Sequence, residues 1–478
     1  MAFLTVEDLK LSFNLFCVVY GAGTLGMPGN YARAGFTWAT LALLLMAAIN
    51  IYTTSRISKV LLVAPKTVKT YGDLGEWCFG KVGRYVTVVT QLLVCWMVPI
   101  AFLVLSGSLL TTLFPGAFEA TTWIILLGLA VMPVCLMPSL KESAGVAAAG
   151  AFGTLFADIV AIYVLVSKMH DAGQGLSLPT PQITFNGVTS VFGNLSLGYS
   201  AGVVIPALQR EHSDPSRMPR VIVFTLGVCS VLFLIVSITG SSTVGCQIPG
   251  NLLFAIEGDK LGFTPPRGGI VLAFLAMQLH CAVAFAVILF PTFYIMERVV
   301  FGFHKVQNAD AVVDEAVYNA LDTPAAVVTD DDATKIDVAA VESVESVAHY
   351  HSFTDYLKAM VLRLVMVTCC IVLAIVWKDQ FMDILDFVGA SSTAMTSMIL
   401  PTLFYLKTFG KTINAAEKAW CIFTLVVCAF LGIYVSYYTG KALFTPTPTD
   451  PTIKFPYCAV EYQKMVFTNR TYYNLPPL

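Results

Sequence analysis

Charged residues are scarce in this sequence. Only 12% of its 478 residues are Asp, Glu, Lys or Arg, whereas a soluble domain carries about a quarter. The formal net charge is −2, and the lysines and arginines stand at the ends of apolar runs, so the pattern excludes a nucleic-acid-binding module. Hydrophobic residues make up 57% of the chain, and the mean hydropathy is +0.76. We therefore expect the chain to lie in a bilayer with membrane lipids around it.

The sequence also lacks the signatures of a metal site or an enzyme. Its twelve cysteines form no C-x-x-C pair and no spacing with histidine that is typical of zinc ligands. It has no H-E-x-x-H motif and no clustered acid pair inside an apolar run. We predict no metal, no organic cofactor and no catalytic residue. Glu7 and Asp8 precede the first apolar run, which argues against a cleaved signal peptide with a basic start.

Long apolar runs dominate what is present. A helix of about 20 residues crosses about 30 Å of hydrocarbon, and eleven runs reach that scale. They cover about 9–34, 37–63, 84–113, 121–138, 145–167, 187–208, 219–245, 268–300, 356–377, 383–405 and 416–439. The sequence predicts an all-α, polytopic membrane protein with about eleven transmembrane helices.

The distribution of basic residues predicts a cytoplasmic N-terminus. With this orientation the short outer loops hold only Arg33, Lys168, Lys260, Arg267 and Lys378, and the inner loops are richer in lysine and arginine. An odd number of helices then places the C-terminal tail, residues 441–478, outside the cell or in a lumen. The sequon at Asn469 in this tail is predicted to be glycosylated, and the sequon at Asn194, inside an apolar run, is expected to be silent.

Two further features depend on this orientation. Cys246, at the outer end of the seventh run, and Cys458, in the tail, are the pair expected to share an oxidising compartment. A disulfide needs their Cα atoms within about 7 Å, which the sequence does not specify. Residues 303–355 carry many acids against Lys305 and Lys335. They are predicted to form a disordered cytoplasmic loop, either a solvated linker or a segment that binds a regulatory partner.

The first apolar run is interrupted by Gly21-Ala22-Gly23-Thr24-Leu25-Gly26-Met27-Pro28. Each glycine weakens a helix by about 1 kcal/mol and the proline by about 3 kcal/mol. Freed backbone groups are tolerated at membrane depth only where protein buries them or a cavity receives them. The N–H groups of the second half-helix can attract a carboxylate, and the carbonyls of the first can attract an ammonium. Close packing at small residues is the alternative, whereas a dinucleotide site is excluded because no strand precedes the glycines.

The sixth run contains a matching interruption. Gly193, Gly198 and Gly202 lead to Pro206. Runs one and six each begin a set of five, covering about 9–167 and 187–405, and an extra helix follows at about 416–439. Paired interruptions at matching positions indicate an inverted-repeat transporter with a binding site at the midplane. Residues 1–440 are predicted to form this one transporter domain.

The same motifs resemble those of the amino acid/auxin permease (AAAP) family in the amino acid-polyamine-organocation superfamily. The interruption at 21–28 is similar to the first-helix motif of the family, and 204–211 is similar to its sixth-helix exit. The loop 71–75, the segment 138–141 and the stretch 388–407 fit in order, so the resemblance covers about 9–440. It implies a leucine-transporter-type 5+5 inverted repeat with helices 1 and 6 broken, and amino-acid transport, usually with protons. Gly202 stands where many members have histidine or a bulky residue, so the substrate stays open.

The resemblance also implies the binding residues and the function. The ends of an amino acid would be bound by Tyr20, Gly21, Ala22, Gly23, Thr24, Leu25 and Gly26 and by Leu197, Gly198, Tyr199 and Ser200. Tyr199 either shapes the side-chain pocket or is an ordinary core aromatic. The predicted function is secondary active transport of a small neutral amino acid by alternating access, in the plasma membrane or a vacuolar or lysosomal membrane. The alternative is an amino-acid sensor that signals through the acidic loop.

Two ionisable residues are candidates for ion coupling. Asp158 is the one acid near the middle of a predicted helix, the fifth, and His280 is the one histidine at similar depth, on the eighth. Such groups at membrane depth are functional candidates by default. The eighth run has no serine or threonine at 277–285 to bind sodium. Protons are therefore favoured over sodium, with Asp158 as carrier and His280 as partner or gate, although Asp158 as a plain hydrogen-bonding residue remains the alternative.

Overall fold

The structure of the chain is a computed structural model. It describes residues 4–137, 144–264, 266–303, 350, 352–446, 450 and 452–475, and only the backbone of 144–147. The first part forms α1 (Val6–Val19), η1 (Ala22–Gly26), α2 (Met27–Val63), α3 (Tyr71–Leu113), α4 (Ala120–Leu136) and α5 (Ala144–Ala172). The second part forms α6 (Phe185–Gly198), η2 (Gly202–Val204), α7 (Ile205–Glu211), η3 (Pro215–Arg217), α8 (Met218–Val244), η4 (Gly245–Gln247), α9 (Leu252–Ala255), α10 (Arg267–Phe301), α12 (Phe353–Val376), α13 (Phe381–Val388), η6 (Gly389–Thr393), η7 (Met395–Ile399), α14 (Leu400–Phe409), α15 (Ala415–Phe444) and η8 (Val460–Tyr462).

These elements reproduce the predicted membrane helices. Nine helical stretches of the described residues are long and apolar enough to cross a membrane. They correspond to ten of the eleven apolar runs, because the stretch Ala22–Val63 contains parts of the first two. The fourth run forms α4, which has 17 residues. The prediction of an all-α, polytopic membrane protein is confirmed.

Glycines with positive φ divide the two longest helices. Gly35 in α2 has φ 73° and ψ 165°, a conformation open to glycine because it lacks Cβ, and it separates the first predicted helix from the second. Gly80 bends α3 in a similar way, with φ 66°. The segment 71–75, predicted as a loop, is instead the helical start of α3. Thr70 accepts a hydrogen bond from the Asp73 N–H, and Asp73 accepts one from the Thr70 N–H, so a capping box begins the helix there.

The tenth predicted helix is divided into α13, the π-helical turns η6 and η7, and α14. The backbone of this segment contacts the backbone of α6 where Gly389 meets Gly193. A Cβ on Gly389 would lie 1.8 Å from the Gly193 carbonyl oxygen, so only glycine fits there. This contact fixes α13 and η6 against α6 before its break.

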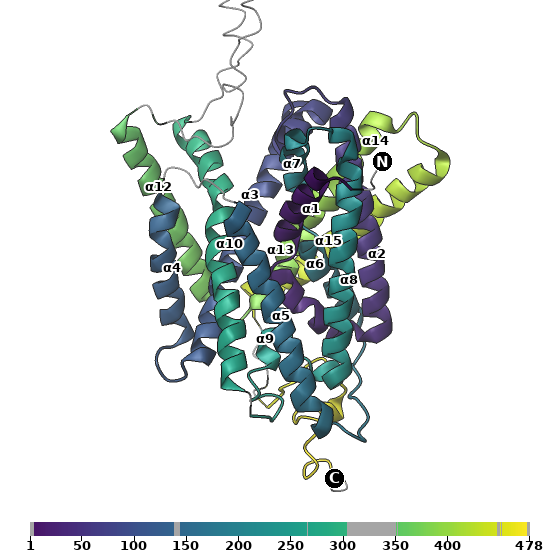
Figure 1. Cartoon of the computed structure of the whole chain (residues 1–478), viewed down its shortest axis with the longest axis vertical. Helices are drawn as coiled ribbons and strands as arrows, with labels where there is room; N and C mark the ends of the chain where they lie inside the picture. The colour runs from purple at the N-terminus through teal and green to yellow at the C-terminus, as the bar shows by residue number, and fades with distance from the viewer. Residues whose placement is uncertain are drawn as a thin grey trace, which may run out of the picture.

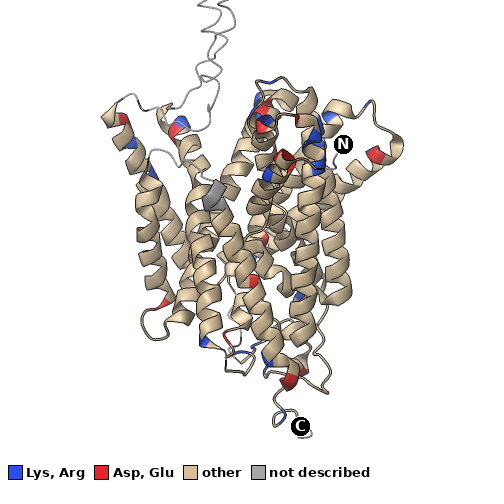
Figure 2. Ribbon diagram, viewed as in Figure 1, with Lys and Arg blue, Asp and Glu red and all other residues tan. Residues whose placement is uncertain are grey.

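The two chain ends lie at opposite ends of the helical bundle (Figure 1). We call the end that carries the N-terminus, the loop after α7 and the start of α12 the N-terminal face, and the other end the C-terminal face. Figure 1 also shows α4 and α12 side by side on one flank. Charged residues concentrate at the two faces, and few lie between them (Figure 2).

The bundle is built on two hydrophobic clusters, and the broken helices lie where these clusters meet. One cluster contains residues of α3, α5, α10 and α12, together with Ala22 and Leu25 of η1. The other contains residues of α1, α2, α6, α8 and α14, together with Tyr20 and Tyr199. The breaks are therefore packed between the two main groups of helices.

Candidate functional site

Helix 1 is broken at the predicted glycines. α1 ends at Val19, and Tyr20 and Gly21 have non-helical dihedrals. The 3-10 turn η1 follows, and α2 begins at Met27 with Pro28 in its first turn, where its missing N–H costs no hydrogen bond. Backbone donors and acceptors of two half-helices are thus brought to one place inside the bundle.

Helix 6 is broken at a matching depth, slightly later than predicted. Leu197 and Gly198 are still the last residues of α6, and Tyr199 and Ser200 lie outside it. The turn η2 and the short helix α7 follow, with Pro206 in the first turn of α7. Helices 1 and 6 therefore repeat one pattern: a half-helix, a few non-helical residues, a 3-10 turn, and a second half-helix that contains proline.

The two breaks lie against each other. A Cβ on Gly23 would lie 3.2 Å from the Gly198 Cα, and a Cβ on Gly26 would lie 2.7 Å from the Asn194 Nδ2. A Cβ on Gly198 would lie 2.5 Å from the Met27 Cε. The glycines that weaken the helices are thus the residues that let the two breaks approach.

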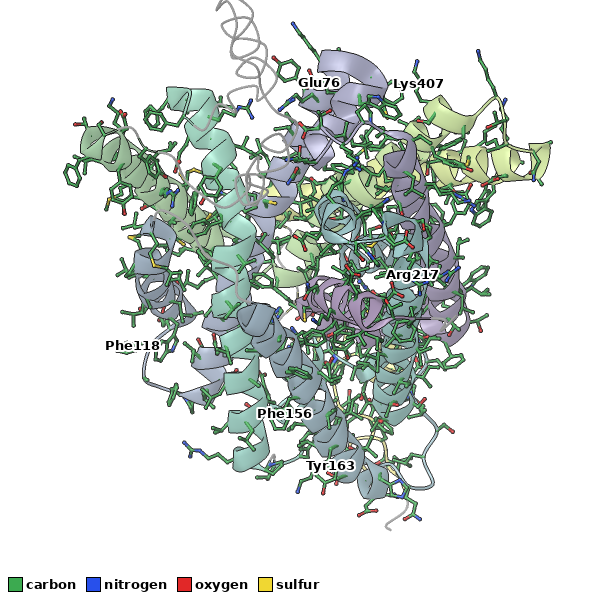
Figure 3. All side chains as sticks on the ribbon, turned by 45° about the horizontal axis from the view of Figure 1, so that its top comes forward. Glu76, Phe118, Phe156, Tyr163, Arg217 and Lys407 are labelled. Carbon is green, nitrogen blue, oxygen red and sulfur yellow. A yellow bond between two sulfur atoms is a disulfide. The ribbon has the colours of Figure 1, made fainter. Side chains whose placement is uncertain are left out.

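Asp158 of α5 connects its helix to the break of helix 1. Its side chain is buried, with 1% exposed. Asp158 Oδ2 accepts hydrogen bonds from the Tyr20 hydroxyl at 2.9 Å and the Thr24 hydroxyl at 3.0 Å. Asp158 Oδ1 is buried and has no hydrogen-bond partner within the described part of the chain. The opposite side of α5 is exposed, as Phe156 and Tyr163 show (Figure 3).

His280 of α10 contacts the same break from another side. Its Nδ1 lies 3.0 Å from the Gly150 carbonyl oxygen, which makes Nδ1 the donor. Its Nε2 has no hydrogen-bond partner among the described residues and would lie 3.3 Å from a Cβ on Gly21. The edge of its ring meets Phe102 at a centroid distance of 5.7 Å. In the described part of the chain no hydrogen bond joins His280 to Asp158, so the two coupling candidates meet through helix 1.

The side chain of Tyr199 is directed towards α8. Its hydroxyl lies 2.7 Å from the Ser230 Oγ, and its ring packs against Phe233 at 5.2 Å. The contacts of this side chain are those of a core aromatic, whereas its backbone belongs to the break of helix 6.

Comparison with known proteins identifies the family. The model of the family "Transmembrane amino acid transporter protein" matches residues 7–445. The chain belongs to this family. It is 23% identical over 446 residues to amino acid transporter AVT1I of Arabidopsis thaliana, which covers 90% of this chain and 93% of that protein. It is 24% identical over 277 residues to vacuolar amino acid transporter 7 of Saccharomyces cerevisiae, which covers 54% of each protein.

A solved structure supports the fold of this amino acid transporter. The structure of MhsT in complex with L-phenylalanine matches with a TM-score of 0.51 at 10% identity, covering 90% of this chain and 98% of MhsT. At this identity the likeness shows the fold alone. The leucine-transporter-type fold and the AAAP family predicted from the sequence are confirmed.

The transporter also has a buried ion pair that the sequence does not reveal. Arg33, predicted in an outer loop, lies in α2 with 5% of its side chain exposed and pairs with Asp386 of α13. The Arg33 Nη2 also donates to the Asn30 Oδ1 at 2.8 Å. The pair lies between the break of helix 1 and the C-terminal face. An arginine and an acid near the ends of two different apolar runs are the sequence signal for it.

An ion-pair cluster lies at the other end of the bundle. At the N-terminal face, Asp8 of α1 pairs with Arg217, the labelled residue at the start of α8 (Figure 3), and with His212. Asp8 is fully buried. The first half-helix is thereby held against the segment that follows α7.

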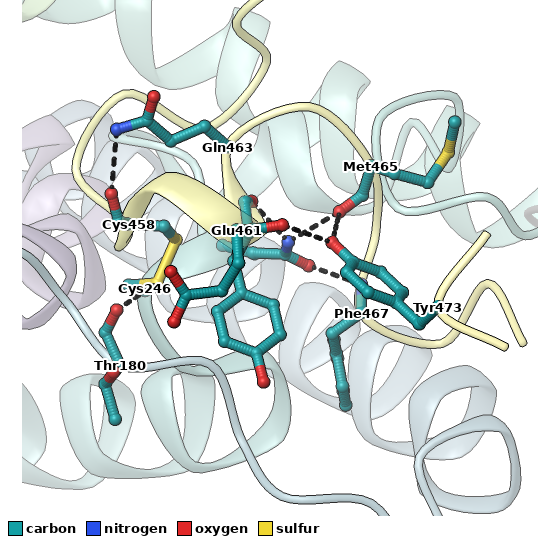
Figure 4. Close-up of a disulfide and its surroundings, with 10 residues drawn as sticks. Thr180, Cys246, Cys458, Glu461, Gln463, Met465, Phe467 and Tyr473 are labelled. Carbon is teal, nitrogen blue, oxygen red and sulfur yellow. Dashed lines mark hydrogen bonds between the residues drawn. A yellow bond between two sulfur atoms is a disulfide. The ribbon is translucent and has the colours of Figure 1, made fainter. Parts of the chain in front are cut away.

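The tail of the transporter is anchored on the C-terminal face. Cys246 and Cys458, the pair singled out from the sequence, form a disulfide in the structure (Figure 4). The Gln247 side chain donates to the carbonyls of Tyr462 and Met465 and accepts from the Phe467 N–H, each at 2.9 Å.

The two predicted glycosylation sites lie in different surroundings, and two other predicted segments lie outside the described residues. Asn469 lies on this anchored tail and is half-buried, whereas Asn194, the other sequon, is fully buried. The acidic segment 303–355 lies outside the described residues from 304 to 349, and so does the motif at 138–141.

Proposed function

We propose that this protein is a secondary active transporter that moves a small neutral amino acid by alternating access, coupled to protons. The observation that carries the proposal is the position of Asp158, whose carboxylate accepts hydrogen bonds from two residues of the helix 1 break. Few groups stabilise a charged carboxylate at this depth. Neutralising it by protonation therefore removes a large energetic cost. Protonation of Asp158 weakens its hydrogen bonds to Tyr20 and Thr24. The break of helix 1 is then free to change its conformation.

The substrate class follows from what surrounds the breaks. The residues 20–26 and 197–200 include no acidic or basic side chain. Half-helix ends in these segments offer N–H groups to a carboxylate and carbonyls to an ammonium, the two groups common to all amino acids. A neutral side chain therefore needs no further charged partner. Sodium is disfavoured because His280, and no serine or threonine hydroxyl, is the α10 side chain that meets Gly21.

Uptake by purified protein in proteoliposomes tests the proposal. We expect saturable uptake of labelled neutral amino acids that increases with an inward proton gradient and ignores a sodium gradient. Asp158→Asn should lose gradient-driven uptake yet retain exchange of substrate across the membrane, because the amide keeps a hydrogen-bond acceptor but binds no proton. Asp171→Asn is the matched control, since Asp171 lies at the exposed end of the same helix. Sodium-dependent uptake, or normal accumulation by Asp158→Asn, would falsify proton coupling through this residue.

Valine substitutions at Gly23 and Gly26 test whether the two breaks bind the substrate. Gly26→Val places a side chain into the Asn194 amide, and Gly23→Val places one against Gly198. Both variants should insert into the membrane and lose substrate binding. Gly227→Val is the control, because a Cβ on this α8 glycine meets no atom within 4 Å. Normal uptake by both site variants would remove these residues from the binding site.

We also infer that the N-terminal face is cytoplasmic, in the plasma membrane or a vacuolar or lysosomal membrane. The charge distribution supports this, and so does the disulfide on the opposite face, because disulfides persist in oxidising compartments. In eukaryotic cells, Asn469→Gln should remove a glycan and shift the mobility of the protein. A tail tag that a protease reaches only from the cytoplasmic side would overturn the orientation.

A further inference from the structure

Asn194 is a buried amide with no hydrogen-bond partner among the residues that the structure describes. It lies in α6 shortly before the break, and its exposed fraction is 0%. Neither its Oδ1 nor its Nδ2 has a hydrogen-bond partner in the described ranges of the chain. Folded proteins rarely leave a buried amide unpaired, because both its donor and its acceptor then lose their hydrogen bonds with water. The neighbouring Asn30 differs, since its Oδ1 accepts from Arg33 and its Nδ2 contacts the Met27 Sδ.

The unpaired amide lies at the amino end of a half-helix. A Cβ on Gly26 would lie 2.7 Å from the Asn194 Nδ2 and 2.9 Å from its Oδ1, so both polar atoms face this residue. Gly26 immediately precedes α2, whose amino end carries a positive partial charge, although the Met27 N–H already donates to the Thr24 carbonyl and Pro28 has no N–H. The Asn194 amide therefore borders the place where the proposed function puts the substrate carboxylate.

We propose that Asn194 recognises both ends of an α-amino acid, with Nδ2 donating to the carboxylate and Oδ1 accepting from the ammonium. This proposal rests on the proposed function and names its substrate class more closely. The carboxylate and ammonium of an α-amino acid share one carbon, so they present an acceptor and a donor side by side, as the amide does. In β-alanine and 4-aminobutanoate the two groups are further apart, and one amide pairs poorly with both. Asn194 thus selects α-amino acids over their longer homologues.

Competition uptake tests this selectivity. Proteoliposomes take up a mixture of the twenty labelled α-amino acids while unlabelled β-alanine or 4-aminobutanoate competes. Asn194→Leu, which has a similar volume and no polar atoms, should raise the KM for the labelled mixture at least tenfold and change its maximal rate much less. The discrimination against β-alanine and 4-aminobutanoate should fall by a similar factor. A purely structural role would lower the amount of active protein and leave this ratio unchanged.

Two more variants separate the outcomes. Asn194→Asp keeps an acceptor for the ammonium but repels the carboxylate. The KM of this variant for the labelled mixture should therefore rise as well. Ser196→Ala is the matched control, because Ser196 is equally buried in α6 but its hydroxyl donates to the Phe192 carbonyl at 2.7 Å. It should keep both the KM and the discrimination. If the wild-type protein takes up none of the mixture, the proposed function fails. If it does and Asn194→Leu keeps the KM and the discrimination, the role of Asn194 alone is refuted.

Discussion

The interactions that join the helices near the two faces of the transporter differ. At the N-terminal face, the Asp8 carboxylate accepts from the Arg217 Nη2 at 2.7 Å and lies 2.8 Å from the His212 Nε2, and 13% of the Arg217 side chain is exposed. Below the C-terminal face, both members of the Arg33–Asp386 pair are almost fully buried, with 5% and 2% of their side chains exposed. A covalently anchored tail lies on that face as well.

The difference indicates which face opens more easily. Separating either pair leaves a buried carboxylate without its partner, at about 3–5 kcal/mol, but the Arg217 side chain, with 13% exposed, is nearer to water than the Arg33 side chain, with 5% exposed. The tail adds a covalent constraint at the C-terminal face alone among the described residues. We therefore expect the substrate-free transporter to open towards its N-terminal face first, and the following substitutions test that order.

The largest effect is expected from Arg33→Met. This variant leaves Asp386 buried without its cation, so uptake should fall on the order of 100-fold and the Tm should drop, in line with about 3–5 kcal/mol. The double variant Arg33→Met/Asp386→Leu removes both charges and should recover most of the Tm, which fluorescence melting of the purified protein measures.

Arg84→Met is the control for this comparison. Arg84 pairs with Glu76 and Asp73 at the N-terminal face, and 35% of its side chain is exposed, so its loss should cost about 0–1 kcal/mol. If Arg33→Met behaves like Arg84→Met, burial does not strengthen the closure of the C-terminal face.

A smaller effect is expected from Asp8→Asn. The change removes one charge from the cluster that holds α1, and it should shift the population towards an open N-terminal face by about 5–30-fold, as expected for 1–2 kcal/mol. Labelling of a Ser12→Cys variant by an impermeant maleimide measures this, because Ser12 lies on α1 with 5% exposed. Lys10→Gln is the control, since Lys10 is an exposed charged residue on the same helix. Equal labelling rates with and without the Asp8→Asn substitution would show that the cluster does not keep α1 closed.

A change of pH in the ordinary assay range does not reproduce the effect expected of Asp8→Asn. Arg217 donates hydrogen bonds to Asp8 and holds the pKa of its carboxyl below the ordinary value of 3.8. A depressed pKa contributes stability above the ordinary value and loses it only as the pH falls below that value. Uptake assays between about pH 5 and 8 leave the Asp8 carboxylate charged, so a pH dependence in that range does not come from protonation of Asp8.

The sequence predicts the breaks and the coupling candidates because their signals are local. Glycine and proline weaken a helix wherever they occur, and Asp158 stands out as an acid at mid-membrane depth. The sequence also contains a local signal for the start of α3, since Thr70 and Asp73 have the spacing of a capping box. The predicted loop at 71–75 is wrong because apolar length alone set the helix start at 84.

The remaining features depend on contacts that a single sequence does not specify. Arg33 and Asp386 are 353 residues apart, and their pairing depends on how α2 and α13 both pack against α6. The isolation of Asn194 is likewise a tertiary property, because an asparagine near a helix end finds a partner in most surroundings. The sequence suggests Cys246 and Cys458 as partners, but only the fold brings their Cα atoms to 5.3 Å.

The smallest effect on transport is expected from Cys458→Ser. Loss of the disulfide should lower the Tm, because a disulfide of this kind contributes about 2–5 kcal/mol to stability. Uptake should change less than about threefold, because Gln247 still holds the tail by three hydrogen bonds, each worth about 1 kcal/mol. Dithiothreitol added to wild-type proteoliposomes should reproduce this small change. Cys369→Ser is the control, because Cys369 is an exposed free thiol. If Cys458→Ser instead abolishes uptake as Arg33→Met does, the anchored tail and not the buried ion pair determines how the C-terminal face opens.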